Sequence, residues 1–66
     1  MRIKINGDWA EQAGPVSVSE LLMRLGLKTD RVAVECNREI VRRKHYGETQ
    51  LADGDELEIV TLVGGG

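Results

Sequence analysis

Residues 56–66 read ELEIVTLVGGG, and this stretch decides the fold. Leu57, Ile59, Thr61 and Val63 stand at every second position, three of them apolar and the fourth β-branched, which is the period of a β-strand. Three glycines follow the strand directly, whereas glycine makes up only about 7% of residues on average. The stretch predicts a strand over 56–63 and a slim glycine tail that reaches roughly 10 Å beyond it. The predicted core-facing positions are Leu57, Ile59, Thr61 and Val63.

The N-terminal residues predict a β-hairpin. Ile3 and Ile5 alternate with polar neighbours, as in a half-buried strand. Asn6-Gly7 is a strong turn signal, because both residues tolerate positive φ. We therefore expect a return strand over 9–13, in which Trp9 and Ala13 are the apolar positions.

A helix follows the predicted hairpin. Ser17 and Glu20 form a capping-box pattern, and Val16 stands where a hydrophobic staple begins. Gly26 marks the exit through the left-handed conformation. A helix this short needs a sheet to pack on. Its predicted apolar stripe consists of Val18, Leu21, Leu22 and Leu25.

The remaining segments complete an α+β fold. We expect a strand over 31–37, a short partner strand over 40–41, an irregular polar stretch over 42–50 and a turn over 52–55. The order β-β-α-β-β-β predicts a mixed sheet of four to five strands with one main helix packed on one face. A last strand parallel to the first would make a ubiquitin-like β-grasp domain over 1–63, with a flexible glycine tail over 64–66.

Composition narrows the function. The net charge of −2 argues against nucleic acid or an anionic membrane as the main partner. The single cysteine and the lack of a long apolar segment predict a cytoplasmic chain. One histidine and no cysteine–histidine cluster leave no metal site and no catalytic set, so we expect a protein that is not an enzyme.

With these elements placed, the chain resembles the ThiS family of sulfur carrier proteins along its whole length. The ending is the most specific part, where Asp53-Gly54-Asp55 is followed by a strand and by Gly64-Gly65-Gly66. The earlier motifs are weaker individually and occur in the family's order and spacing. They are IKING at 3–7, SVSELL at 17–22, VAVECN at 32–37 and IVRR at 40–43.

The resemblance implies that the carboxylate of Gly66 is the reactive group. In the family, an E1-like adenylyltransferase of the ThiF type uses ATP and magnesium to make a C-terminal acyl-adenylate. Sulfur from cysteine, delivered by a desulfurase system, then gives a thiocarboxylate, a 1-thioglycine at Gly66. Thiazole synthase of the ThiG type takes this sulfur for the thiazole ring of thiamine. The resemblance implies no bound cofactor and a monomer when free.

The tail chemistry explains the glycines. A Cβ on Gly66 would crowd the carbonyl that must lie in line with the α-phosphate of ATP. Gly65 must also lack a side chain to fit the channel of the partner enzyme. Gly64 would act as the swivel. Val60 and Leu62 should point outward next to Val63, either as ordinary exposed surface or, as we favour, as a partner footprint.

Several readings stay open at this point. The small subunit of molybdopterin synthase and a carrier for another sulfur acceptor would use the same chemistry. A ubiquitin-like protein modifier would use the same activation, and a plain binding module would need no tail. Among single residues, Cys36 is expected in the core and His45 in solvent, while Trp9 is either a sheet cover or a partner contact.

Overall fold

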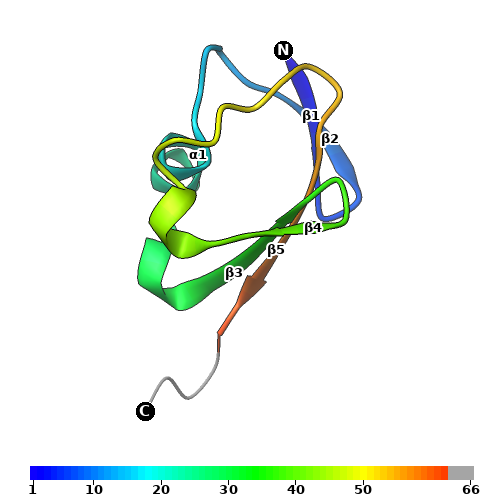
Figure 1. Cartoon of the computed structure of the whole chain (residues 1–66). Helices are drawn as coiled ribbons and strands as arrows, with labels where there is room; N and C mark the ends of the chain where they lie inside the picture. Colours follow the sequence, from blue (N-terminus) through cyan, green and yellow to red (C-terminus); the bar gives the residue numbers. More distant parts are fainter. Residues whose placement is uncertain (63–66) are drawn as a thin grey trace.

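The computed structural model describes residues 1–62, and the predictions for Val63 to Gly66 lie outside these described residues. Within residues 1–62 the strands form one mixed five-stranded sheet in the order β2-β1-β5-β3-β4, and the single α-helix of this part lies against one face (Figure 1). The α+β class and the predicted element order are confirmed. The elements are β1 (Arg2–Ile5), β2 (Asp8–Glu11), α1 (Val18–Arg24), η1 (Thr29–Arg31), β3 (Val32–Cys36), β4 (Glu39–Val41), η2 (Arg43–His45) and β5 (Glu56–Thr61).

The first hairpin turns at Asn6 and Gly7, whose φ angles are 49° and 89° as the turn requires. The return strand differs from the predicted range of 9–13, since β2 begins at Asp8 and ends at Glu11. The turn consists of two residues only, so strand pairing resumes at Asp8, opposite Ile5. Ala10 therefore lies opposite Ile3. Of the two predicted apolar positions, Trp9 is 47% exposed and Ala13 lies beyond the end of β2.

Helix α1 has the predicted ends. The Ser17 hydroxyl accepts from the Glu20 N–H at 3.1 Å, and the Glu20 carboxylate accepts from the Ser17 N–H at 3.1 Å. At the other end, Gly26 has φ 73° and the Leu27 N–H donates to the Leu22 carbonyl at 2.9 Å. Leu25 is the C-cap and stays 41% exposed, so the buried stripe is one residue shorter than predicted.

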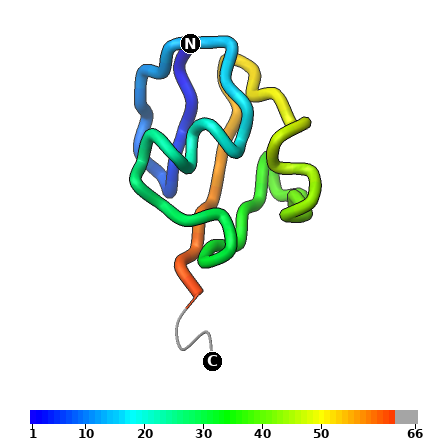
Figure 2. The backbone as a smooth tube through the Cα atoms, turned by 90° about the vertical axis from the view of Figure 1, so that its left-hand side faces the viewer, coloured from blue at the N-terminus to red at the C-terminus, as the bar shows by residue number. Residues whose placement is uncertain are grey.

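Strand β5 lies at the centre of the sheet. It runs parallel to β1 on one side and antiparallel to β3 on the other, which is the predicted β-grasp arrangement. Leu57 and Ile59 are buried beneath the helix, as predicted, whereas Thr61 is exposed. Figure 2 shows the helix crossing one face of the sheet and β5 leaving at the end opposite the N-terminus. The core consists of Ile3, Val16, Val18, Leu21, Leu22, Val32, Val34, Tyr46, Leu51, Leu57 and Ile59.

The stretch 42–50 is less irregular than its sequence predicted. It contains the 3-10 turn η2, and Tyr46 folds back into the core with only 4% of its surface exposed. The Tyr46 hydroxyl donates to the Val32 carbonyl at 3.3 Å, which satisfies its polar atom in the interior. The pattern missed this residue because a single buried aromatic leaves no periodic signal.

The turn before β5 fixes where that strand starts. The Arg2 N–H donates to the Asp53 carboxylate at 2.6 Å, and the Gly54 N–H donates to the Arg2 carbonyl at 2.7 Å. Asp55 accepts from the Ala52 N–H at 2.8 Å and from the Asn37 side chain at 3.1 Å. The Asp-Gly-Asp motif therefore ties β5 to both β1 and β3, and its role here is structural.

Candidate functional site

Strand β5 is held on the β1 side as far as Ile59 and on the β3 side as far as Leu62. On the β1 side, the Asn6 amide accepts from the Ile59 N–H at 2.7 Å and donates to the Ile59 carbonyl at 3.0 Å. On the β3 side, the Leu62 N–H donates to the Arg31 carbonyl at 2.7 Å. The sheet therefore gives the tail a fixed point of departure.

Two apolar side chains are exposed next to that departure point. Val60 is 57% exposed and Leu62 is 44% exposed, which confirms that both point away from the core. Neither packs in the described fold as a core residue, and their function as a partner footprint remains a prediction. Of the predicted site residues, Val63, Gly64, Gly65 and Gly66 lie outside the described residues.

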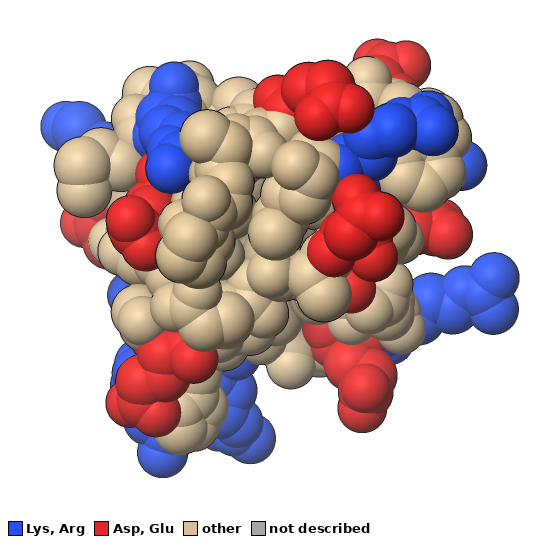
Figure 3. Space-filling model, turned by 90° about the horizontal axis from the view of Figure 1, so that it is seen from above, with Lys and Arg blue, Asp and Glu red and all other residues tan. Residues whose placement is uncertain are grey.

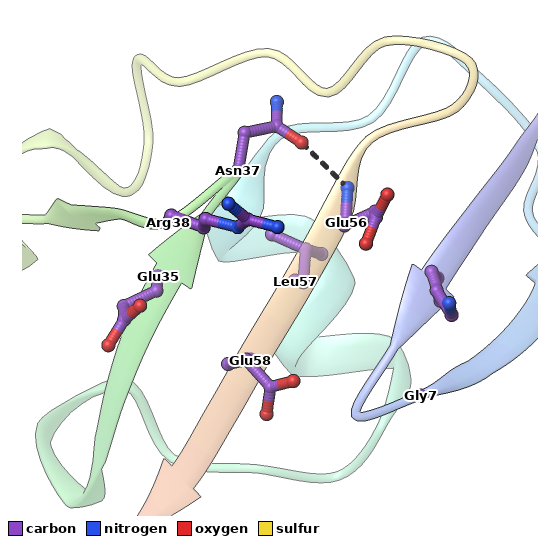
Figure 4. Close-up of a pocket in the computed structure, with 8 residues that line it drawn as sticks. Gly7, Glu35, Asn37, Arg38, Glu56, Leu57 and Glu58 are labelled. Carbon is purple, nitrogen blue, oxygen red and sulfur yellow. Dashed lines mark hydrogen bonds between the residues drawn. The ribbon is translucent and has the colours of Figure 1, made fainter.

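On the sheet face opposite the helix, the part of β5 that precedes Val60 carries charged side chains. Glu35 of β3 and Glu58 of β5 are direct cross-strand partners, and Figure 4 shows both on this face. They border a hollow of about 460 Å³ whose rim includes Lys4 and Arg38. Among residues 1–62, no group of three or more metal-ligating side chains comes together, so the hollow gives no sign of a metal centre.

Trp9 lies on the same sheet face, at its β2 edge. The ring is 47% exposed. The Arg2 guanidinium lies 4.7 Å from the ring centroid, and the Lys4 ammonium lies 5.6 Å from it. These cation–π contacts hold the indole against β1. The sequence left the place of Trp9 open, and the structure makes it an exposed side chain fixed by its neighbours.

Cys36 and His45 show no catalytic arrangement within the described part of the chain. Cys36 is half-buried; burial, together with the charge of Asp55, a hydrogen bond to Asp55 and the charge of Glu39, raises the pKa of its thiol. A raised pKa makes the thiol a weaker nucleophile at neutral pH. His45 is half-exposed and lies 3.7 Å from the Glu48 carboxylate, as expected of a surface residue.

Positive and negative side chains are mixed on the surface at the end of the molecule that carries the N-terminus. Figure 3 shows Lys and Arg interspersed with Asp and Glu around the end that carries the N-terminus. Such mixing provides no continuous basic track for a nucleic-acid backbone on that face. Within residues 1–62 there is also no helix of the length and apolarity that crossing a membrane requires.

Comparison with known proteins agrees with this geometry. The family model described as "ThiS family" matches residues 3–66. A crystal structure of the thiamine biosynthesis protein ThiS from Geobacter metallireducens superposes with a TM-score of 0.86 at 33% identity, over the full length of both chains. The sulfur carrier protein ThiS of Bacillus subtilis is 37% identical over 97% of this chain and 98% of its own length.

A second kind of relative is larger. The thiazole synthase of Paramagnetospirillum magneticum is 42% identical over the whole of this chain, and that of Magnetococcus marinus is 38% identical. The chain spans only about a fifth of the length of these two proteins, 20% in each case. A segment like this chain is thus part of two thiazole synthases.

The fold defines a β-grasp domain of the ubiquitin-like class. Within that class, the chain belongs to the ThiS family, the sulfur carrier proteins of thiamine biosynthesis. ThiS proteins are sulfur carriers rather than catalysts.

Proposed function

We propose that the chain carries sulfur as a thiocarboxylate on Gly66 and donates it for thiazole formation. The observation that carries this proposal is the position of β5, which is anchored on both sides and leads out of the fold directly before the glycine run. On this proposal the working unit is a β-grasp domain over 1–63 with a functional tail over 64–66.

The chemistry would proceed in two steps on a partner enzyme. One carboxylate oxygen of Gly66 attacks the α-phosphorus of ATP, and pyrophosphate leaves with its magnesium ion. A sulfur nucleophile then attacks the acyl carbon and AMP leaves, because a mixed anhydride is a far better acyl donor than a carboxylate. The sulfur would come from cysteine through a desulfurase system as a persulfide, and this second step would be completed when a thiol of the partner cleaves the S–S bond of the acyl disulfide and is itself oxidised to a disulfide. The result is 1-thioglycine at Gly66, with no cofactor bound to the carrier itself.

Two partners follow from this scheme. An E1-like adenylyltransferase of the ThiF type would activate the tail, and a thiazole synthase of the ThiG type would receive the sulfur. The second is supported by the two thiazole synthases that contain a matching segment. Both reactions would take place in the cytoplasm, where ATP and cysteine are available and where a single free thiol such as Cys36 stays reduced.

Val60 and Leu62 are proposed to dock these partners, together with Val63. The two described side chains are exposed, apolar and adjacent to the departure point of the tail. Apolar side chains that become buried at the centre of an interface contribute most of its binding energy. The footprint would therefore align the tail with the active site of the partner.

A substitution in the tail tests the proposal. Gly66→Ala should abolish adenylation, because a Cβ beside the reacting carbonyl crowds a channel built for glycine. The measurement is ATP–pyrophosphate exchange with the adenylyltransferase, and the thermal unfolding of the variant should equal that of the wild type. Ser19→Ala on the helix is a matched control. Full exchange by Gly66→Ala would contradict the proposal, whereas higher-mass conjugates in a lysate would favour a protein modifier.

A further inference from the structure

The backbone of β5 directs its hydrogen-bonding groups alternately to its two neighbours. The Leu57 carbonyl accepts from the Asn6 N–H at 2.9 Å, and both backbone groups of Ile59 pair with the Asn6 side chain. These odd-numbered residues therefore face β1. The even-numbered residues face β3, as the bond between the Leu62 N–H and the Arg31 carbonyl shows.

Thr61 is the next odd-numbered residue, so its N–H and C=O point to the β1 side. Strand β1 has already ended at Ile5, and the chain turns away at Gly7. Within residues 1–62, no hydrogen bond reaches either backbone group of Thr61 on this side, and the residue is exposed. Among the described residues, the edge of β5 therefore offers one free donor and one free acceptor at strand spacing.

The sequence does little to protect this edge. Natural proteins protect free strand edges with short strands, proline, inward-pointing charged residues or a bulge, and of these only the short length applies at Thr61. Residues 57–62 contain no proline, no lysine and no glycine, and they pair with β3 without a bulge. Two exposed apolar side chains, Val60 and Leu62, flank the free backbone groups. An extended backbone is the complement of such an edge.

We propose that an extended segment of the adenylating partner adds to the sheet beside Thr61, in the position that β1 would occupy if it continued beyond Ile5. The added strand would hold the end of β5 by main-chain hydrogen bonds while the tail enters the active site. This inference rests on the proposed function and adds the mode of docking. A second copy of the chain is the less favourable occupant, because each copy has a net charge of −2 and two glutamates on β5.

Amide hydrogen exchange of the ¹⁵N-labelled carrier tests the proposal directly. The Thr61 amide should exchange rapidly in the free protein and at least about tenfold more slowly with saturating adenylating enzyme and ATP. The amide of Ile40 on the outer edge strand β4 is an internal control that should not change. Equal Thr61 exchange in both states would overturn the inference. Protection that grows with carrier concentration alone would assign the edge to a second copy, and would overturn it too.

A pair of variants gives an independent test. Thr61→Pro removes an N–H that the described fold does not use, so the thermal midpoint should change little. Its KM as a substrate of the adenylating enzyme should rise about tenfold, whereas Thr61→Val, which keeps the N–H, should stay near wild type. An unchanged KM for Thr61→Pro would refute strand addition while leaving the carrier function intact. Failure of the wild-type chain to be adenylated would instead refute the proposed function.

Discussion

Asn6 takes the place of a neighbouring strand where β1 leaves the sheet. Its φ of 49° turns the backbone away, while its side chain serves the N–H and C=O of Ile59. The turn could be predicted from the Asn-Gly pair, because the preference for positive φ is local. The contact with Ile59 could not be predicted, since it joins residues that are 53 positions apart.

Asn6→Gly should destabilise the fold by about 2 kcal/mol, because it leaves two backbone groups of the buried residue Ile59 without partners. Glycine keeps the positive φ, so the change isolates the side chain. The matched control is Asn37→Gly. That residue has a φ of 52° and makes its side-chain bonds at exposed positions. Urea unfolding gives both free energies, and equal losses would contradict this account of Asn6.

Cys36 should titrate above the ordinary range of a thiol, since its pKa is raised by burial and by nearby negative charge. Its rate of reaction with iodoacetamide should therefore reach half-maximum at higher pH in the folded protein than in urea. Because the folded pKa is the higher one, the stabilisation linked to Cys36 is complete below the unfolded pKa and is lost as pH rises through the folded pKa.

The matching stability measurement uses Cys36→Ser. Its free energy of unfolding should lack the part of the alkaline decline that the thiol causes. An identical decline in the variant and the wild type, or a lower reaction midpoint in the folded protein, would show that the thiol is not perturbed in the way described.

At the scale of elements, the two segments with the clearest sequence patterns, α1 and β5, were predicted well. The ends of α1 follow from Ser17, Glu20 and Gly26, and the faces of β5 follow from the alternation that begins at Leu57. The bounds of β2 were missed because its two apolar residues, Trp9 and Ala10, are adjacent and lie on opposite faces, so the strand shows no alternation. The exposure of Thr61 was missed because the alternation predicts which face of the sheet a residue lies on, but not how far the elements packed on that face extend.

Val60→Ser combined with Leu62→Ser should raise the KM of the adenylating enzyme for the carrier by about tenfold or more, with little change in thermal stability. Both side chains are exposed, so little packing is lost. Ile40→Ser is the matched control, because Ile40 is 80% exposed on β4, at an edge of the sheet. An equal effect of the control would mean that general surface apolarity, rather than a footprint at β5, determines docking.

The molecule as a whole is a small scaffold around one central strand. The turn at 52–55 sets the start of β5, Asn6 and Arg31 hold its end, and the helix covers one face. The order of elements was sufficient to predict the fold class, whereas the family rested on the resemblance of the ending and of the earlier motifs in their order and spacing. The exposed Trp9 and the free edge at Thr61 depend on register and strand length, which only the assembled sheet defines.

The central claim is that Gly66 carries sulfur, and the intact mass of the protein purified from its own host tests it most directly. The account predicts a species heavier by about 16 Da, located on Gly66 by fragmentation, since oxidation of a methionine adds nearly the same mass. That species should be alkylated at mildly acidic pH, where the raised pKa of Cys36 keeps its thiol unreactive. An unmodified Gly66 after incubation with adenylating enzyme, desulfurase, ATP and cysteine would contradict the account.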